Sequence, residues 1–132
     1  MNCRLIFGVI LLLCLAGCKQ PLSPADALMI EHRMALMDRV AAIPREPPRL
    51  LYDSRDEFKF AAEANCLEWS ITLNYWFAAS RPDFVIAKVI PHEYSHLASC
   101  FYRGRMDDGT GEVHDAFWRQ WVKDLGGDPD YV

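Results

Sequence analysis

Basic residues are scarce relative to acidic ones in this chain. Its 132 residues include 14 Lys and Arg against 18 Asp and Glu, which gives a formal net charge of −4. A protein that holds nucleic acid phosphates is expected to show the opposite balance. The composition also argues against disorder, because hydrophobic residues make up 52% of the chain and charged residues 24%, as in globular domains. The length suits one domain and leaves no room for a second core.

The main hydrophobic run is too short to span a bilayer comfortably. It covers Leu5–Leu15 and follows Arg4, which provides a short basic start. A run of this length after a basic start is typical of the core of a secretory signal. We therefore expect residues 1–18 to be a targeting segment and residues 19–132 to form the folded domain.

The targeting segment ends in Leu15-Ala16-Gly17-Cys18, which resembles the lipobox of bacterial lipoproteins. In that class of protein the signal is cut before the cysteine, and the cysteine carries lipid. The resemblance implies an exported lipoprotein that Cys18 anchors to a membrane of the bacterial cell envelope. An ordinary signal peptide and an uncleaved N-terminal anchor are the alternatives.

Cysteine is sparse in the expected domain after Cys18, where Cys66 and Cys100 are the two remaining thiols. An oxidising compartment would let them pair if their Cα atoms lie within about 7 Å. Two separate buried thiols are an equally good interpretation.

Histidine is also rare, yet two of the four histidines lie in the pattern His92-Glu93-Tyr94-Ser95-His96. On a helix, residues four apart lie on one face, so His92 and His96 can bind the same metal ion. Glu93 can then take a proton from a water that zinc activates. A catalytic zinc needs a third protein ligand and one open position. Cys100 does not qualify, because two helical turns, about 12 Å, separate it from His92.

His114 is the best candidate for the third ligand. A helix expected from about Glu112 to Leu125 would place His114 at the start of an aromatic stripe, facing inward. Glu112 and Asp115 are weaker candidates, because helical spacing turns both away from that stripe. A third histidine six residues after His96 is excluded by Tyr102. The fourth histidine, His32, is expected to be solvated on the surface of another helix.

The remaining pattern predicts an α+β domain with about three helices on a small antiparallel sheet of three strands. The first helix should begin after Ser23, bury a stripe and end at Pro44. The helix that carries the site should begin with Ser80 as its cap and end near Tyr102, with a kink or distorted turn at Pro91. The expected stripe of the first helix is Leu28, Leu36, Val40 and Ile43, with Met29 and Met37 flanking it, and the expected strands are residues 49–52, 57–60 and 67–74.

Three segments together resemble the SprT-like zinc metallopeptidases, over roughly residues 49–129. They are Ile71-Thr72-Leu73-Asn74, then Val89-Ile90-Pro91-His92-Glu93-Tyr94-Ser95-His96-Leu97, then His114-Asp115-Ala116-Phe117-Trp118 followed by Leu125-Gly126. The resemblance implies a minimal zincin-like fold, one Zn²⁺ held by His92, His96 and His114, and Glu93 as the general base. Two features depart from the family: Asp115 stands where members usually have Gly, and the cysteine-rich zinc ribbon of many members is absent from the sequence.

Function is therefore expected to be zinc-dependent hydrolysis of a protein or peptide, at a membrane. A non-catalytic zinc-stabilised domain that binds a partner at the membrane is the second hypothesis. An intracellular DNA-associated protease is the third, and the acidic balance and the missing ribbon argue against nucleic acid as a partner. The reaction would also benefit from a hydrogen-bond donor to the developing charge, and spacing does not choose among Tyr75, Tyr94 and Tyr102.

Overall fold

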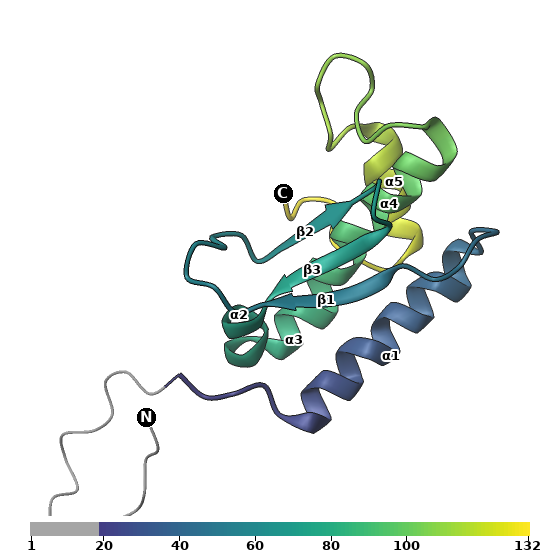
Figure 1. Cartoon of the computed structure of the whole chain (residues 1–132). Coiled ribbons are helices and arrows are strands. Elements are labelled where there is room, and N and C mark those ends of the chain that lie inside the picture. The colour runs from purple at the N-terminus through teal and green to yellow at the C-terminus, as the bar shows by residue number, and fades with distance from the viewer. Residues whose placement is uncertain (1–18) are drawn as a thin grey trace, which may run out of the picture.

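The computed structural model describes residues 19–132, and the predicted signal peptide with Cys18 lies outside them. The fold is α+β, as predicted: a three-stranded sheet packs on a layer of helices (Figure 1). Among the described residues, none of the helices combines the length and apolarity needed to cross a bilayer. In chain order the elements are α1 (Pro24–Ala41), β1 (Arg49–Asp53), β2 (Ala62–Asn65), β3 (Ser70–Asn74), α2 (Tyr75–Ser80), α3 (Pro82–Phe84), a π-helical segment η1 (Val85–Val89), α4 (Ile90–Arg103) and α5 (Ala116–Asp124).

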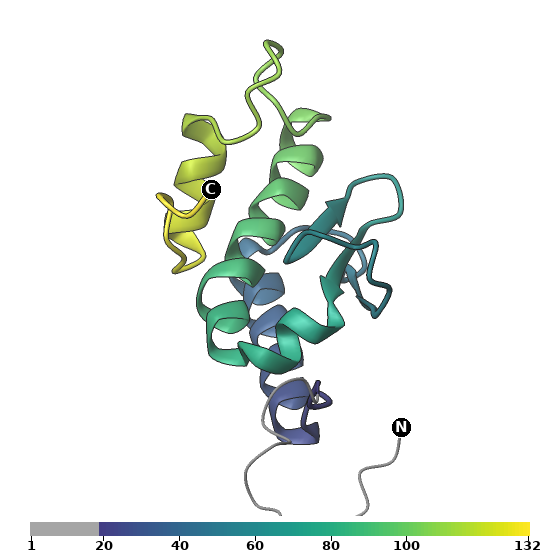
Figure 2. The same cartoon turned by 90° about the vertical axis from the view of Figure 1, so that its left-hand side faces the viewer.

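Helix α4 lies at the centre of the domain. The sheet lies on one side of it and α5 on the other, as Figure 2 shows, and α1 also packs on it. Residues 90–99 of α4 are all buried. The three residues of the predicted metal-binding pattern therefore lie on the most enclosed element of the described structure.

The sheet is mixed, so the prediction of a purely antiparallel sheet is wrong. Its strand order is β1-β3-β2. β1 runs parallel to β3, with Leu50 opposite Ile71, and β2 runs antiparallel to β3. The central strand is therefore the last in sequence, and β2 forms one edge.

Two strand boundaries differ from the prediction. Residues 57–60 do not form a strand, and Phe60 is 71% exposed, because the edge strand is Ala62–Asn65, whose buried side chains are the small Ala62 and Ala64. The third strand begins at Ser70 instead of Leu67. Trp69 has a positive φ of 51° and belongs to a turn, and Leu67 in that turn is 98% exposed.

Helix α1 forms where predicted, with Ser23 accepting a hydrogen bond from the Asp26 amide, but it buries a different face. Ile30, Met34, Met37 and Ala41 are buried, whereas the predicted Leu28, Leu36 and Val40 are exposed, as is Met29. Apolar residues occur on both sides of this helix, so periodicity alone did not identify the side that packs.

Ser80 does not cap the site helix. It is the last residue of α2, a short helix that the sequence analysis missed and that Asn74 caps by accepting from the Phe77 amide. The distorted turn expected near Pro91 is confirmed: η1 precedes α4, and the Ile90 amide donates to the Val85 carbonyl five residues back. In that register Pro91 would leave the Ile86 carbonyl free, and Arg33 of α1 donates to it at 3.1 Å.

Candidate metal centre

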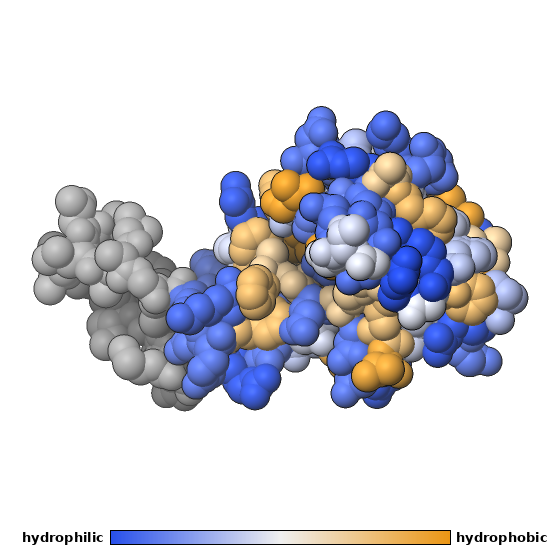
Figure 3. All heavy atoms as spheres, turned by 90° about the horizontal axis from the view of Figure 1, so that it is seen from above, coloured by the Kyte–Doolittle hydropathy of each residue, from blue (hydrophilic) through white to orange (hydrophobic). Residues whose placement is uncertain are grey.

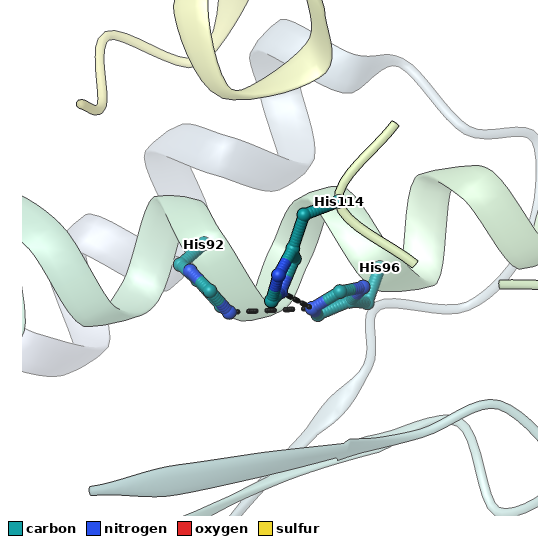
Figure 4. Close-up of side chains that lie close together, drawn as sticks. All are labelled: His92, His96 and His114. Carbon is teal, nitrogen blue, oxygen red and sulfur yellow. Dashed lines mark hydrogen bonds between the residues drawn. The ribbon is translucent and has the colours of Figure 1, made fainter. Parts of the chain in front are cut away.

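His92 and His96 lie one turn apart on α4 and point to the same side of it. Their Nε2 atoms are 3.2 Å apart. Both side chains are buried, so the helix presents two ring nitrogens from a protected surface. Figure 4 shows the two rings between the sheet and the segment that carries His114.

His114 reaches the same point from a loop. Its Nε2 lies 3.2 Å from that of His96. The prediction that His114 belongs to the first turn of a helix is wrong, because α5 begins at Ala116 and Asp115 is its N-cap. Asp115 has an extended backbone, with ψ −177°, and its side chain caps the first turn of α5, so the helix does not extend back to Glu112. The loop before α5, residues 104–115, contains three glycines with positive φ.

Asp115 holds this loop to the site helix. One carboxylate oxygen accepts the Trp118 amide at 2.9 Å and the other accepts the guanidinium of Arg103, the last residue of α4. Burial would raise the pKa of Asp115, but the hydrogen bonds from Arg103 and the Trp118 amide outweigh it and hold the pKa below its usual range. The charged carboxylate thus fixes the position of the residue next to His114.

The three histidines have the spacing of a metal site. One nitrogen of each can be chosen so that all lie within 4.8 Å of one another. Nitrogens about 2.0–2.1 Å from a tetrahedral zinc lie roughly 3.3–3.4 Å from each other, close to the two Nε2–Nε2 distances of 3.2 Å in this cluster. Hydrogen bonds between the rings do not explain why three Nε2 atoms converge. A neutral ring carries one N–H, so the Nε2 of His96 cannot donate to both of its neighbours. The residues therefore fit a zinc ion.

Neutral imidazoles are the form that binds a metal, and burial favours that form here. It lowers the pKa of His92 to about 4 and that of His96 to about 3, with repulsion between the rings adding to the effect. Burial also lowers the pKa of His114, although it is less enclosed. At neutral pH, all three rings are ready to donate a lone pair.

Other residues fix the orientation of His92. Its Nδ1 lies 3.1 Å from the Tyr131 carbonyl oxygen, which can accept a hydrogen bond from an Nδ1–H group. In that tautomer, Nε2 carries no proton and faces the cluster. Trp118 donates its indole N–H to the His92 carbonyl at 3.2 Å, and its ring lies 4.8 Å from that of His92. The aromatic side chain of α5 therefore packs directly against the ligands.

Glu93 lines a cleft that also reaches His96 of the histidine cluster. The cleft has a volume of about 320 Å³, and its lining includes Glu93, His96, edge-strand residues and loop residues Met106 and Val113. Glu93 itself is only 8% exposed. Burial raises its pKa to about 7, although hydrogen bonding to the Ala64 backbone opposes the shift. Figure 3 views the molecule from the side of loop 104–115, where apolar residues are interspersed among hydrophilic ones.

A protein-family model identifies the chain. The model of the SprT-like family matches residues 32–131, which is most of the sequence and all of the site. The chain belongs to the SprT-like family. No curated protein and no solved structure matches it significantly.

The other candidate residues of this SprT-like protein have different roles. Glu112 accepts the His114 amide at 3.0 Å and Asp115 caps α5. Cys66 and Cys100 form a disulfide, with Cα atoms 6.1 Å apart, which decides between the two interpretations of these thiols. His32 is exposed on α1, as predicted.

None of the three tyrosines considered from sequence lines the metal centre. Tyr94 donates to Asp38 of α1, Tyr75 accepts the Leu22 amide, and Tyr102 stacks on Trp121. Tyr131 was missed, and its ring lies 5.3 Å from that of His92. Tyr131 is far from His92 in sequence and belongs to no motif. The one sequence feature that could have indicated it is its place shortly after the helix whose aromatic stripe faces the site.

Proposed function

We propose that this protein is a zinc-dependent metallopeptidase. The observation that carries the proposal is that Glu93 lines an open cleft together with His96, one of the three converging histidines. A structural zinc site has four protein ligands and is closed. Among the described residues, His92, His96 and His114 are the one set of three or more metal-binding side chains whose ligand atoms converge, and the set holds three donors. An open position next to a buried carboxylate suits hydrolysis better than structural support.

The chemistry divides between the metal and Glu93. A zinc ion held by the three histidines supplies a Lewis acid that makes water nucleophilic at neutral pH and stabilises developing negative charge. Glu93 accepts the proton from the attacking water and delivers it to the leaving amine. A pKa of about 7 suits both transfers, because the group is then neither too weak a base nor too weak an acid near neutral pH.

The cleft fits an extended peptide. β2 pairs with β3 along one edge, and its residues Ala62, Glu63 and Ala64 line the cleft on the other side. A peptide in β conformation could add to this free edge through main-chain hydrogen bonds, with its scissile bond beside Glu93. This supports a protein or peptide substrate and agrees with the small side chains of the strand.

The proposed location is a membrane of the bacterial cell envelope, with lipid on Cys18. The hydrophobic run and the Leu15-Ala16-Gly17-Cys18 sequence support it. The Cys66–Cys100 disulfide also supports it, since structural disulfides persist mainly in oxidising, exported compartments. A non-catalytic binding domain at the membrane is the main competing function, and an intracellular DNA-associated protease is disfavoured by the acidic charge.

Glu93→Gln tests the function. The variant keeps the size of the side chain but cannot accept a proton, so it should retain about one zinc per chain and lose turnover by at least about 100-fold, the lower range for general acid–base catalysis. The measurement is hydrolysis of casein by wild type and variant, each analysed for zinc. Glu63→Gln is the matched control, because Glu63 lines the same cleft and should be dispensable.

Three outcomes are informative. Equal turnover by wild type and Glu93→Gln at equal zinc content would exclude Glu93 as the base. Equal losses in Glu93→Gln and Glu63→Gln would point to the charge of the cleft instead of a proton transfer. Zinc-loaded wild type that hydrolyses no protein substrate would favour the binding-domain alternative.

A further inference from the structure

Helix α1 has an apolar face that nothing in the described structure covers. Met29 is 53% exposed, Leu28 51% and Val40 49%, and Leu36 is also exposed. By the roughly 100° per residue of a helix, these four lie within about a third of the circumference, opposite the buried Ile30, Met34 and Met37. We call the four residues Leu28, Met29, Leu36 and Val40 the outer strip.

Ionisable residues on the outer strip are mainly basic. By the same spacing, His32 and Arg39 project from within the strip, and both are exposed. The acidic Glu31 and Asp26 lie outside it, about 60° beyond Leu28 and about 40° beyond Val40. A groove of about 680 Å³ adjoins the strip, and Leu36, Pro47 and Pro48 help to line it. An apolar face with basic residues among its apolar ones fits the boundary between lipid head groups and acyl chains.

The start of α1 is close in sequence to the proposed anchor. Five residues, Lys19–Ser23, separate Cys18 from Pro24, so even a fully extended linker reaches only about 20 Å. A membrane that holds Cys18 would therefore hold α1 at its surface, where contact by the outer strip becomes an intramolecular event.

The outer strip faces away from the catalytic cleft. On α4, Tyr94 is about 200° round the helix from His92, and its hydroxyl donates to Asp38 of α1 at 2.8 Å. α1 therefore packs on the side of α4 opposite the ligands. On α1, Leu36 is again about 200° from Asp38, so the strip points further outward. Figure 1 shows α1 and the cleft strand β2 on opposite sides of the domain.

We propose that the outer strip docks onto the lipid surface to which the chain is anchored, so that the cleft faces away from the membrane. This inference rests on the proposed anchor, but it does not depend on peptide hydrolysis. It assigns a function to a helix face that folding leaves exposed, and it restricts the substrates to those that approach from the aqueous side.

Photocrosslinking of the full chain tests this orientation. p-Benzoylphenylalanine is placed at Met29 or Val40, and at Phe60 as a control that is also exposed but lines the cleft. Each variant is purified, checked for zinc and for acylation of Cys18 by mass spectrometry, and reconstituted into vesicles of phosphatidylethanolamine and phosphatidylglycerol. We expect lipid adducts at positions 29 and 40 and none at position 60.

The other outcomes overturn the proposal in distinguishable ways. Equal lipid adducts at all three positions would mean that the anchored domain has no preferred face. Adducts between two protein chains at position 29 or 40 would assign the strip to a dimer. A chain that lacks acylation and leaves the vesicles would contradict the anchor as well. Casein hydrolysis by the same wild-type preparation would separate each of these results from a failure of the peptidase proposal.

Discussion

At the residue scale, His114 is the member of the histidine cluster that no helix holds in place. His92 and His96 are fixed by a buried helix, whereas His114 lies in a glycine-containing loop. Replacement by Ala should abolish tight zinc binding, because two ligands do not complete a catalytic site. The loss should exceed the roughly 10–100-fold that removal of an outer-shell partner costs.

Zinc per chain after dialysis, measured by mass spectrometry of the metal, checks this prediction. His32→Ala is the matched control, because His32 is exposed on α1, and it should retain full zinc. Full occupancy in His114→Ala would transfer the third-ligand role to another residue. Glu112 would be the first candidate, because both carboxylate oxygens of Asp115 already accept hydrogen bonds.

The carboxylate of Asp115 should make a contribution to the stability of the fold that depends on pH. Its folded pKa lies below the usual value, so its charge stabilises the fold above the unfolded pKa of about 3.9 and loses this effect as pH falls through the folded pKa. Asp115→Asn keeps a capping side chain but removes the charge opposite Arg103. We expect the free energy of unfolding at pH 7 to fall by about 1.5–3 kcal/mol, the range for hydrogen bonds to charged groups.

The measurement is urea unfolding of the metal-free wild type and Asp115→Asn between pH 7 and pH 3. The difference between them should shrink below about pH 4, and protonation of the histidines should cancel because both chains share it. A difference that stays constant over this range would show that the charge of Asp115 does not stabilise the fold.

At the scale of elements, the segment after α5 positions a ligand. The Gly127 amide donates to the Val122 carbonyl, Asp128 pairs with Lys88 at 2.6 Å, and Arg119 donates to the Pro129 carbonyl. These contacts place the Tyr131 carbonyl 3.1 Å from His92 Nδ1. A short C-terminal segment thus favours the orientation in which Nε2 of His92 faces the other two histidines.

Gly127→Ala should displace this segment. A Cβ at Gly127 would lie 2.6 Å from the Cβ of Pro91 and 2.8 Å from a methyl of Val122, closer than packed atoms can approach. We expect zinc affinity to fall about 10–100-fold, as for loss of an outer-shell partner. Competition with a chelator measures the affinity, and Val132→Ala, which truncates a side chain that is 66% exposed, is the control. Unchanged affinity in Gly127→Ala would mean that the Tyr131 carbonyl does not control His92.

Sequence predicted the elements best where one signal was unambiguous. The start of α1 and the end of α4 follow from Ser23 and Gly104, whose backbone preferences act locally, whereas α1 ends at Ala41, before the predicted stop at Pro44. The packed face of α1 was wrong because apolar residues occupy both sides of it. The edge strand was wrong because alternating Phe58 and Phe60 are more conspicuous than Ala62 and Ala64, although close packing against α4 selects small side chains.

At the scale of the whole molecule, the site depends on contacts that no local pattern specifies. The spacing of His92 and His96 on one helix predicted that they share a face, which is confirmed. His114 was predicted to join them, and it does, but from a loop that Arg103 and Asp115 fix instead of from a helix. Tyr131 comes to His92 from 39 residues away, through packing of Gly127 on Pro91. Such long-range placement requires the fold.

The Cys66–Cys100 disulfide joins the two layers of the domain. Cys66 follows β2 and Cys100 belongs to α4, at a sequence separation of 34. Closing a loop of that length should stabilise the fold by about 3–4 kcal/mol, because the unfolded chain loses freedom. Reduction should therefore lower the free energy of unfolding by about that amount and loosen β2 over Glu93.

Urea unfolding of the metal-free protein with and without reductant measures this contribution, since bound zinc would add its own stabilisation. The double variant Cys66→Ala and Cys100→Ala should show no response to reductant, which separates the disulfide from other effects of the reagent. A response below about 1 kcal/mol in wild type would mean that the unfolded chain is already compact around this loop. A response of about 3–4 kcal/mol would mean that this part of the stability of the fold is available only in an oxidising compartment, the condition that the proposed export of the chain supplies.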